Sequence, residues 1–143
     1  MSLPGYTAVV TLPVLWGDQD LFGHVNNTIY VRWFESARVA YWDETGMRDL
    51  LQPRHCGPIL AAVHCNYRRQ LKYPDNIHVG ARVRTLGRTS LKLEHAVFSE
   101  KRQEIVADGE SIVVIFNYAA QHSEVVSEEL RALIRRIEGN LAL

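Results

Sequence analysis

The stretch from residue 27 to residue 45 constrains most strongly how this chain can fold. Its large apolar side chains recur at the spacing of one helix face: Tyr30, Trp33, Phe34, Ala37 and Tyr41. Further apolar side chains widen this face, so we expect protein to cover most of the helix: Ile29, Val31 and Val39. Asn26 or Asn27 can cap the first turn, and Gly46 stands where a C-terminal glycine cap belongs. The chain is therefore predicted to build its core around one long helix.

Most of the remaining sequence alternates between apolar and polar residues with the period of two that strands show. We expect strands over residues 6–16, 59–67, 77–83, 91–97 and 105–117. Pro13 favours an edge position for the first strand, Tyr73-Pro74-Asp75-Asn76 predicts a turn, and Ser127 can cap a short final helix. One strand, a long helix and then four strands in hairpin succession predict an α+β fold, as a single domain over residues 1–143.

Composition excludes several classes of protein. The chain has 143 residues, 47% of them hydrophobic, with 16 basic and 16 acidic side chains, so its formal net charge is zero. A general attraction to nucleic acid or to an anionic membrane is therefore not expected. No stretch approaches the roughly 20 apolar residues of a membrane span, and the N-terminus lacks the pattern of a signal peptide. Cys56 and Cys65 are the only cysteines, which favours a reducing, cytoplasmic location.

A glycine-punctuated loop directly before the long helix carries two carboxylates, Asp18 and Asp20, and one imidazole, His24. The N-terminus of a helix presents unpaired backbone N–H groups and the positive end of the helix dipole. A thioester carbonyl aimed at these groups would be polarised as its oxygen becomes an oxyanion. A nearby carboxylate could attack that carbonyl or deprotonate a water molecule. The loop and the helix start together supply both halves of an acyl-transfer site.

The same segment resembles a known family. It contains Gly17-Asp18-x-Asp20-x-x-Gly23-His24-Val25-Asn26-Asn27-x-x-Tyr30, followed by Phe34-Glu35-x-x-Arg38. This pattern is similar to the signature of the 4-hydroxybenzoyl-CoA thioesterase-like acyl-CoA hydrolases. The resemblance continues through residues 67–75 and 86–91 and weakens after residue 117.

The resemblance implies a hotdog fold, in which a curled sheet wraps one long helix, and hydrolysis of an acyl-CoA to a free acid and coenzyme A. It implies that Asp20 is the catalytic carboxylate, as nucleophile or general base, and that the backbone N–H of Asn27 polarises the carbonyl. Gly23 and His24 would shape the loop, and Tyr30 is a predicted substrate contact. Family members assemble at least as dimers with sites completed across the interface, so a homodimer or homotetramer is expected. No cofactor is implied, because thioester hydrolysis needs only water and a polarised carbonyl.

Simpler roles remain open for several of these residues. Asp18 and Asp20 can cap turns, and His24 can order the loop instead of acting as a base. Glu35 is an alternative second carboxylate, or a partner for Arg38. The loop carboxylates and His24 are also metal-ligand types, but they lack a further ligand cluster, and the cysteines lack C-x-x-C spacing. We therefore expect no metal site and ordinary buried thiols.

Positive charge gathers between residues 68 and 92, where the single acid is Asp75. The basic residues of this stretch are Arg68, Arg69, Lys72, Arg82, Arg84, Arg88 and Lys92. We predict that some of them, Arg88 and Arg68 first, hold the phosphates of coenzyme A, because the forked donors of arginine fit phosphate. A solvated sheet face compensated by acids from elsewhere is the alternative.

Three other functions fit the same residues. An acyl-carrier-protein thioesterase could use the arginine-rich stretch to meet an acidic carrier. A hotdog dehydratase would need a histidine beside a carboxylate, for which His24 is the candidate. A non-catalytic acyl-CoA-binding module could share the fold, and fold analogy alone does not separate these.

Overall fold

The computed structural model describes residues 3–139, so residues 1–2 and 140–143 of the predicted domain lie outside it. Its central element is the helix α1 (Asn27–Glu44). The side chain of Asn26 caps the first turn by accepting a hydrogen bond from the Thr28 N–H at 2.9 Å. At the other end Gly46 has a φ of +81°, the left-handed conformation that glycine adopts after a helix. Both predicted caps are confirmed.

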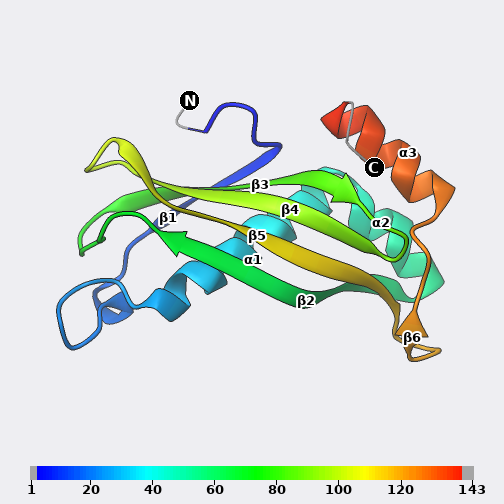
Figure 1. Cartoon of the computed structure of the whole chain (residues 1–143), viewed down its shortest axis with the longest axis horizontal. Helices are drawn as coiled ribbons and strands as arrows, with labels where there is room; N and C mark the ends of the chain where they lie inside the picture. Colours follow the sequence, from blue (N-terminus) through cyan, green and yellow to red (C-terminus); the bar gives the residue numbers. More distant parts are fainter. Residues whose placement is uncertain (1–2, 140–143) are drawn as a thin grey trace.

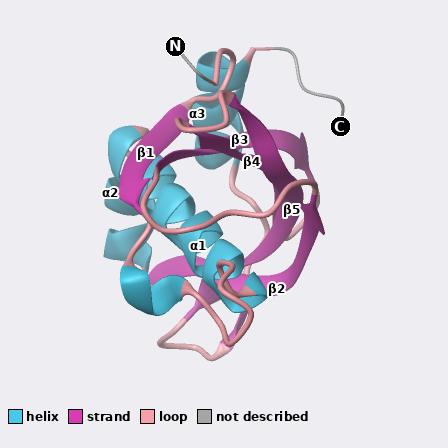
Figure 2. Ribbon diagram, turned by 90° about the vertical axis from the view of Figure 1, so that its left-hand side faces the viewer, coloured by secondary structure: helices cyan, strands magenta, loops and turns pink. Residues whose placement is uncertain are grey.

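A curled antiparallel sheet wraps around α1, as the end-on view in Figure 2 shows. Its strands are β1 (Ala8–Pro13), β2 (Cys56–Tyr67), β3 (Asn76–Leu86), β4 (Ser90–Ser99), β5 (Glu104–Asn117) and the short β6 (His122–Ser123). Their order is β1-β3-β4-β5-β2, with β6 paired to β5. The α+β hotdog architecture is therefore confirmed, with β1 at an edge as Pro13 predicted.

The expected hairpin succession of the last four strands is wrong in one place, because β2 pairs with β5 and not with β3. The connection over residues 68–75 carries the chain from the β2 edge of the sheet to β3, which lies next to the opposite edge strand β1. It passes the start of α1, where the buried Leu71 accepts a hydrogen bond from the Val25 N–H at 2.9 Å. Two strands that follow each other in the chain thus end up separated by β4 and β5.

Short helices complete the fold at the end of the sheet opposite the loop before α1 (Figure 1). The helix α2 (Met47–Leu51) was not expected, and α3 (Glu128–Glu138) begins at the predicted Ser127 cap. The last helical residue, Glu138, accepts hydrogen bonds from the Tyr41 hydroxyl at 2.7 Å and the Val83 N–H at 2.9 Å. No helix within residues 3–139 is long and apolar enough to cross a membrane.

The core lies between α1 and the concave face of the sheet. The predicted helix face is buried, but Val39 is 40% exposed, so α1 is covered on less of its circumference than expected. The open side faces β2, whose residues 59–64 are all exposed. A bulge between Leu60 and Ala62 interrupts the alternation predicted for this strand. One apolar edge of the sheet therefore stays uncovered in the single chain.

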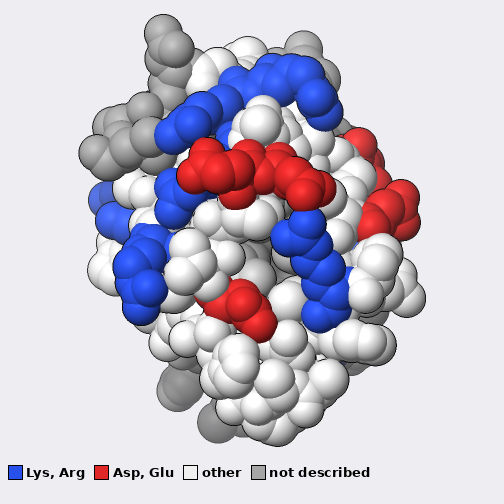
Figure 3. Space-filling view, turned by 90° about the vertical axis from the view of Figure 1, so that its right-hand side faces the viewer, with Lys and Arg blue, Asp and Glu red and all other residues white. Residues whose placement is uncertain are grey.

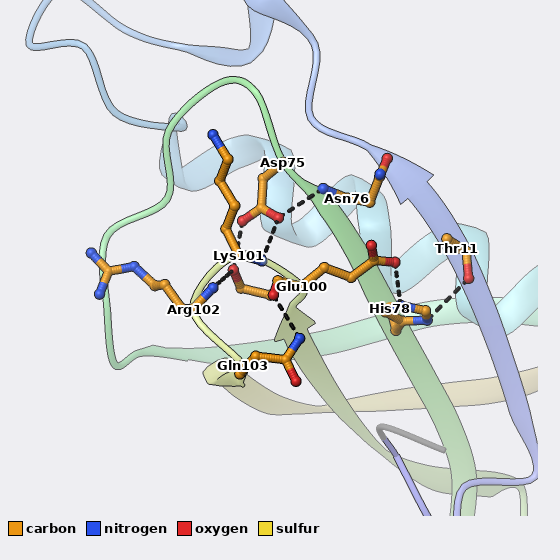
Figure 4. Close-up of polar contacts among 9 residues, drawn as sticks. Thr11, Asp75, Asn76, His78, Glu100, Lys101, Arg102 and Gln103 are labelled. Atoms are coloured by element: carbon orange, nitrogen blue, oxygen red, sulfur yellow. Dashed lines mark hydrogen bonds and ion pairs between the residues drawn. The ribbon is translucent and has the colours of Figure 1, made fainter.

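The predicted turn at residues 73–76 fastens the end of the sheet nearest the loop before α1 (Figure 4). The Asp75 carboxylate accepts hydrogen bonds from the Asn76 N–H at 2.8 Å and the Lys101 N–H at 3.1 Å. The Asp75 carbonyl accepts one from the Val14 N–H at 2.8 Å. The residue thereby ties β3 to the β4–β5 hairpin and fixes the point where the chain leaves β1.

Candidate active site

The loop between β1 and α1 starts with the 3₁₀ turn η1 (Trp16–Asp18). The Asp18 carboxylate accepts a hydrogen bond from the Leu15 N–H at 2.8 Å, and the Asp18 carbonyl accepts one from the Asn26 N–H at 2.9 Å. The first contact closes the 3₁₀ turn, and the second holds the loop onto Asn26, the residue that caps α1. Asp18 therefore has the loop-ordering role that was one of its two predicted alternatives.

Asp20 opens a tight turn that closes at His24. The Asp20 N–H donates to the His24 carbonyl at 2.8 Å, and the Gly23 N–H donates to the Asp20 carbonyl at 3.0 Å. Gly23 has a φ of +80°, which side-chain-bearing residues rarely adopt. One Asp20 carboxylate oxygen accepts the Phe22 N–H at 2.9 Å. The carboxylate is exposed to solvent, so it remains accessible to a substrate.

The first turn of α1 presents an unused donor. Asn27 is the first helical residue, and its N–H has no hydrogen-bond acceptor among residues 3–139. The Asn27 carbonyl accepts a hydrogen bond from the Tyr67 hydroxyl at 3.0 Å. Tyr67 in turn meets the buried Tyr30 edge to face, with ring centroids 5.0 Å apart. This packing joins the end of β2 to the start of α1.

These residues surround one pocket of about 330 Å³. Its lining includes Asp20, His24, Asn27, Tyr30 and Tyr67, together with Val25, Arg68, Arg69 and Gln70. Burial raises the pKa of Tyr30 to about 12, so its hydroxyl stays protonated and can donate a hydrogen bond. A carboxylate and an unpaired helix amide thus face a single opening, which is the arrangement that acyl transfer needs.

Comparison with known proteins agrees with this geometry. The model of the thioesterase-like superfamily matches residues 14–134, which include the whole loop and α1. The chain belongs to this superfamily. It is accordingly a thioester hydrolase, with acyl-CoA thioesterase activity supported at the level of the superfamily.

Individual relatives of this thioesterase are distant in sequence. The uncharacterized protein YsmA of Bacillus subtilis is 26% identical over 82 residues, which cover 57% of this chain and 54% of YsmA. The long-chain acyl-CoA thioesterase FadM of Escherichia coli is 25% identical over 82% of this chain and 89% of FadM. A thioesterase from Thermus thermophilus, solved with coenzyme A and zinc, is 30% identical, covers 96% of this chain and 99% of that one, and has a TM-score of 0.80.

The two predicted phosphate contacts lie far apart in the thioesterase. Arg68 lines the Asp20 pocket and makes a two-point contact with Asp108, at 3.1 and 3.2 Å. Burial alone would raise the pKa of Asp108, but the hydrogen bonds from Arg68 and Asn66 lower it. Arg88 lies in the β3–β4 turn, at the other end of the sheet. Within one chain Arg88 is therefore not brought to Asp20, and its contact with coenzyme A stays a prediction.

The basic stretch is largely neutralised by acids of neighbouring strands, as its alternative interpretation proposed. The ion pairs with acids of β4 and β5 are Arg68–Asp108, Arg69–Glu104, Arg82–Glu94, Arg84–Glu94 and Lys92–Glu110. The end of the molecule carrying α2 and α3 also mixes both signs of charge, as Figure 3 shows and the Arg54–Glu129 pair at 2.6 Å illustrates. Among the described residues, neither the sheet face that carries the basic stretch nor the end that carries α2 and α3 forms a broad basic surface.

Sequence reasoning missed Tyr67 and Gln70 as candidate contacts of the pocket, whereas Arg69 was among the basic residues predicted to hold phosphates. Tyr67 belongs to a motif of the resemblance, and this was the only available signal. The remaining candidates are elsewhere: Glu35 is exposed on α1 and forms no ion pair with Arg38 among the described residues, and both thiols are only partly buried. Within residues 3–139, no three His, Cys, Asp or Glu side chains are grouped as metal ligands would be.

Proposed function

We propose that the chain hydrolyses acyl-CoA thioesters at the pocket of Asp20 and the Asn27 N–H. The single observation that carries this proposal is that an accessible carboxylate and an unpaired helix N–H line the same pocket. The helix amide would hold the thioester oxygen as it gains negative charge. Gly23 and His24 would act by holding the Asp20 turn in shape.

Asp20 can carry the reaction by either of two balanced routes. As a nucleophile, its oxygen attacks the carbonyl carbon, the C–S bond breaks, and sulfur leaves with the electron pair as the thiolate of coenzyme A. Water then cleaves the resulting anhydride and restores the carboxylate. As a general base, Asp20 takes a proton from water, the hydroxide attacks, and that proton passes to the leaving sulfur. Single turnover in ¹⁸O-water tests the first route: label in the Asp20 carboxylate requires an anhydride that water opens at the Asp20 carbonyl, whereas a general base gains no oxygen from water.

Coenzyme A would be held by donors at the rim of the pocket. Arg69 meets a carboxylate at one point, 3.3 Å from Glu104, and also donates to the Arg68 carbonyl at 2.9 Å, whereas Arg68 meets the Asp108 carboxylate at two points. Tyr30 lines the same pocket, and its protonated hydroxyl is a neutral donor. A phosphate at the rim could replace the half-buried Glu104 as the partner of Arg69.

The uncovered β2 edge supports self-association. Its exposed run contains Ile59, Leu60 and Val63, which are 36%, 40% and 37% exposed. An unpaired apolar strand edge invites pairing with another strand. A second copy joined antiparallel through β2 would extend the sheet and cover this edge. Sedimentation of the wild type as a dimer or larger, and of Val63→Arg as a monomer, is expected; a wild-type monomer at micromolar concentration would contradict this part of the proposal.

The test of catalysis is thiol release from a panel of aromatic, short-chain and long-chain acyl-CoAs, comparing wild type with Asp20→Asn. We expect kcat to fall by at least about 100-fold, because the amide can neither attack nor accept a proton. Asp49→Asn, an exposed carboxylate of α2, is the matched control and should retain full activity. Activity that survives in folded Asp20→Asn would contradict the proposal.

A further inference from the structure

A second pocket lies along α1, beyond the Asp20 pocket. It has a volume of about 200 Å³ and apolar walls from Val39, Trp42, Leu60 and Val113. The exposed Glu35 stands at its edge, and Arg38 lies at its base. From Asn27 to Arg38 the helix advances by about 16 Å, or three turns. The pocket therefore lies well away from the reacting carboxylate of the same chain.

Arg38 is held in place by a buried chain of hydrogen bonds. Its Nη1 donates to the Ser111 hydroxyl at 2.8 Å, and that hydroxyl contacts His95 Nε2 at 2.7 Å. His95 Nδ1 lies 3.0 Å from the Gly80 carbonyl, which can only accept, so Nδ1 carries the hydrogen. Ser111 then donates to Nε2 and accepts from Arg38. The arrangement fixes the guanidinium with only one of its nitrogens in use.

The other guanidinium nitrogens reach the pocket. Arg38 is only 5% exposed, yet its Nε and Nη2 have no hydrogen-bond partner among the described residues. No fully buried side-chain nitrogen or oxygen of residues 3–139 lacks a partner, so these two nitrogens must contact accessible space. A buried cation with unmatched donors is costly unless an oxygen acceptor meets it. The pocket is thus apolar on its walls and strongly donating at its base.

We propose that this pocket receives the far end of the acyl group, and that Arg38 selects acyl groups ending in an oxygen acceptor, a carboxylate or a hydroxyl. This rests on the proposed function and names the substrate class of the same reaction. The apolar walls suit the methylene or aromatic part of such a group. The Arg38 donors suit its terminal oxygen, for which a charged partner is worth about ten- to hundredfold in binding.

The pocket serves the Asp20 of a second copy. Antiparallel pairing centred on the exposed run of β2 sets the Pro58 half of one strand beside the Tyr67 half of the other. Pro58 lines the Arg38 pocket and Tyr67 lines the Asp20 pocket. The Arg38 pocket of each copy therefore closes the reaction site of its neighbour.

The first test is the kcat/KM of wild-type protein on acyl-CoAs matched in length but differing at the far end. Hexanoyl-CoA is compared with 6-hydroxyhexanoyl-CoA and adipoyl-CoA, and decanoyl-CoA with sebacoyl-CoA. We expect the oxygen-ended substrate to be favoured by about tenfold or more at one of these lengths. Equal rates at both lengths would overturn the inference and leave the proposed function intact, whereas activity in Asp20→Asn would sink the proposed function itself.

Variants test whether the preference for oxygen-ended substrates depends on Arg38 and not on the rest of the helix. In Arg38→Met the preference for the oxygen-ended substrate over the hydrocarbon-ended substrate of equal length should fall to within about twofold. Arg32→Met, an exposed arginine of the same helix, is the matched control and should keep the preference. If Arg38→Met does not fold, Val39→Phe narrows the pocket from its exposed wall, leaves Arg38 in place, and should also abolish the preference. A preference that survives in either folded pocket variant overturns the inference.

Mixing Asp20→Asn chains with Arg38→Met chains tests the exchange between copies. A mixed pair has one site with both wild-type residues only when Arg38 serves the other copy. Recovery of the wild-type preference in mixed pairs is the expected result. Turnover that keeps the flat profile of Arg38→Met would show that Arg38 does not serve its neighbour.

Discussion

Two polar clusters lie along α1, and they differ in how much water reaches them. At the first turn, Asp20 is exposed and the Asn27 N–H is left unpaired, while the bonds that hold the loop are mostly made by the backbone. Three turns later, Arg38, Ser111 and His95 are each at least 95% buried and depend on one another's side chains. The first cluster keeps its reactive groups available, and the second holds a charge in the core. Disturbing the first should therefore change rate, and disturbing the second should change stability and selectivity.

The largest difference between the two clusters should appear in the stability of the protein at acid pH. Burial lowers the pKa of His95 from 6.5 to about 4, with Arg38 acting in the same direction. Between these two pH values His95 is protonated in the unfolded chain and neutral in the folded chain. The free energy of unfolding therefore decreases as the pH falls from about 6.5 to 4. The loss is about 3 kcal/mol. Urea unfolding at pH 7 and pH 4 measures it, and His95→Gln should lack this part of the pH dependence; an equal slope in that variant would contradict the assignment.

Removal of the hydroxyl that joins the buried cluster should come next in size. Ser111→Ala leaves Arg38 Nη1 and His95 Nε2 without a partner, at a cost of about 2 kcal/mol. Turnover of hydrocarbon-ended acyl-CoAs should stay within about twofold of wild type, since the Asp20 loop is untouched. Ser36→Ala, on the same helix, should change stability by less than about 0.5 kcal/mol. Equal unfolding midpoints for Ser111→Ala and wild type would remove the contrast between the clusters.

In the exposed cluster, the helix cap should couple stability to rate. Asn26→Ala removes the side chain that accepts the Thr28 N–H and should cost about 1 kcal/mol. The cap fixes the first turn of α1, so its loss should leave the Asn27 N–H less well oriented toward the thioester oxygen. We therefore expect kcat to fall by about tenfold. Asn26→Asp retains a capping oxygen and serves as the control. A destabilised Asn26→Ala protein with unchanged kcat would show that the cap does not position the amide.

Tyr67→Phe should have the smallest effect. It removes one hydrogen bond to the Asn27 carbonyl at an exposed position, worth about 0.5 kcal/mol, while the ring packing on Tyr30 is kept. We expect kcat to change by less than about threefold, with Tyr118→Phe as an exposed control. A loss of tenfold or more would give the Tyr67 hydroxyl a direct part in the reaction.

The local signals in the sequence predicted the framework of the fold well. The spacing of apolar residues, Asn26 and Gly46 placed α1, and Ser127 placed the last helix. The pairing of β2 with β5 at the edge of the sheet was not predictable. A period of two in the sequence indicates which face of a strand is buried, and it does not indicate which strand is the neighbour. The short α2 carries too few residues for a periodic signal, and the contacts of Glu138 join residues far apart in the chain.

For the candidate site too, local contacts were predictable from the sequence and contacts between distant segments were not. Asp20, His24 and Asn27 are close in sequence, so their convergence followed from a loop that leads into a helix. Arg68, Arg69 and Gln70 reach the pocket only because of the β2 pairing. Arg88 was chosen because it lies at a strand end, but that strand end is at the end of the sheet opposite the Asp20 loop. The acids that neutralise the basic stretch come from β4 and β5, and a single sequence does not reveal this register.

The open β2 edge has a consequence for how such a catalyst behaves on dilution. If each reaction site is closed by the Arg38 pocket of a neighbour, the number of selective sites depends on the concentration of paired chains and not on the total concentration of chains. Specific activity on oxygen-ended substrates should then decline as the protein is diluted through the dissociation constant of the pair. The selective step would be the first to disappear, because the Asp20 loop and the Asn27 amide belong entirely to one chain.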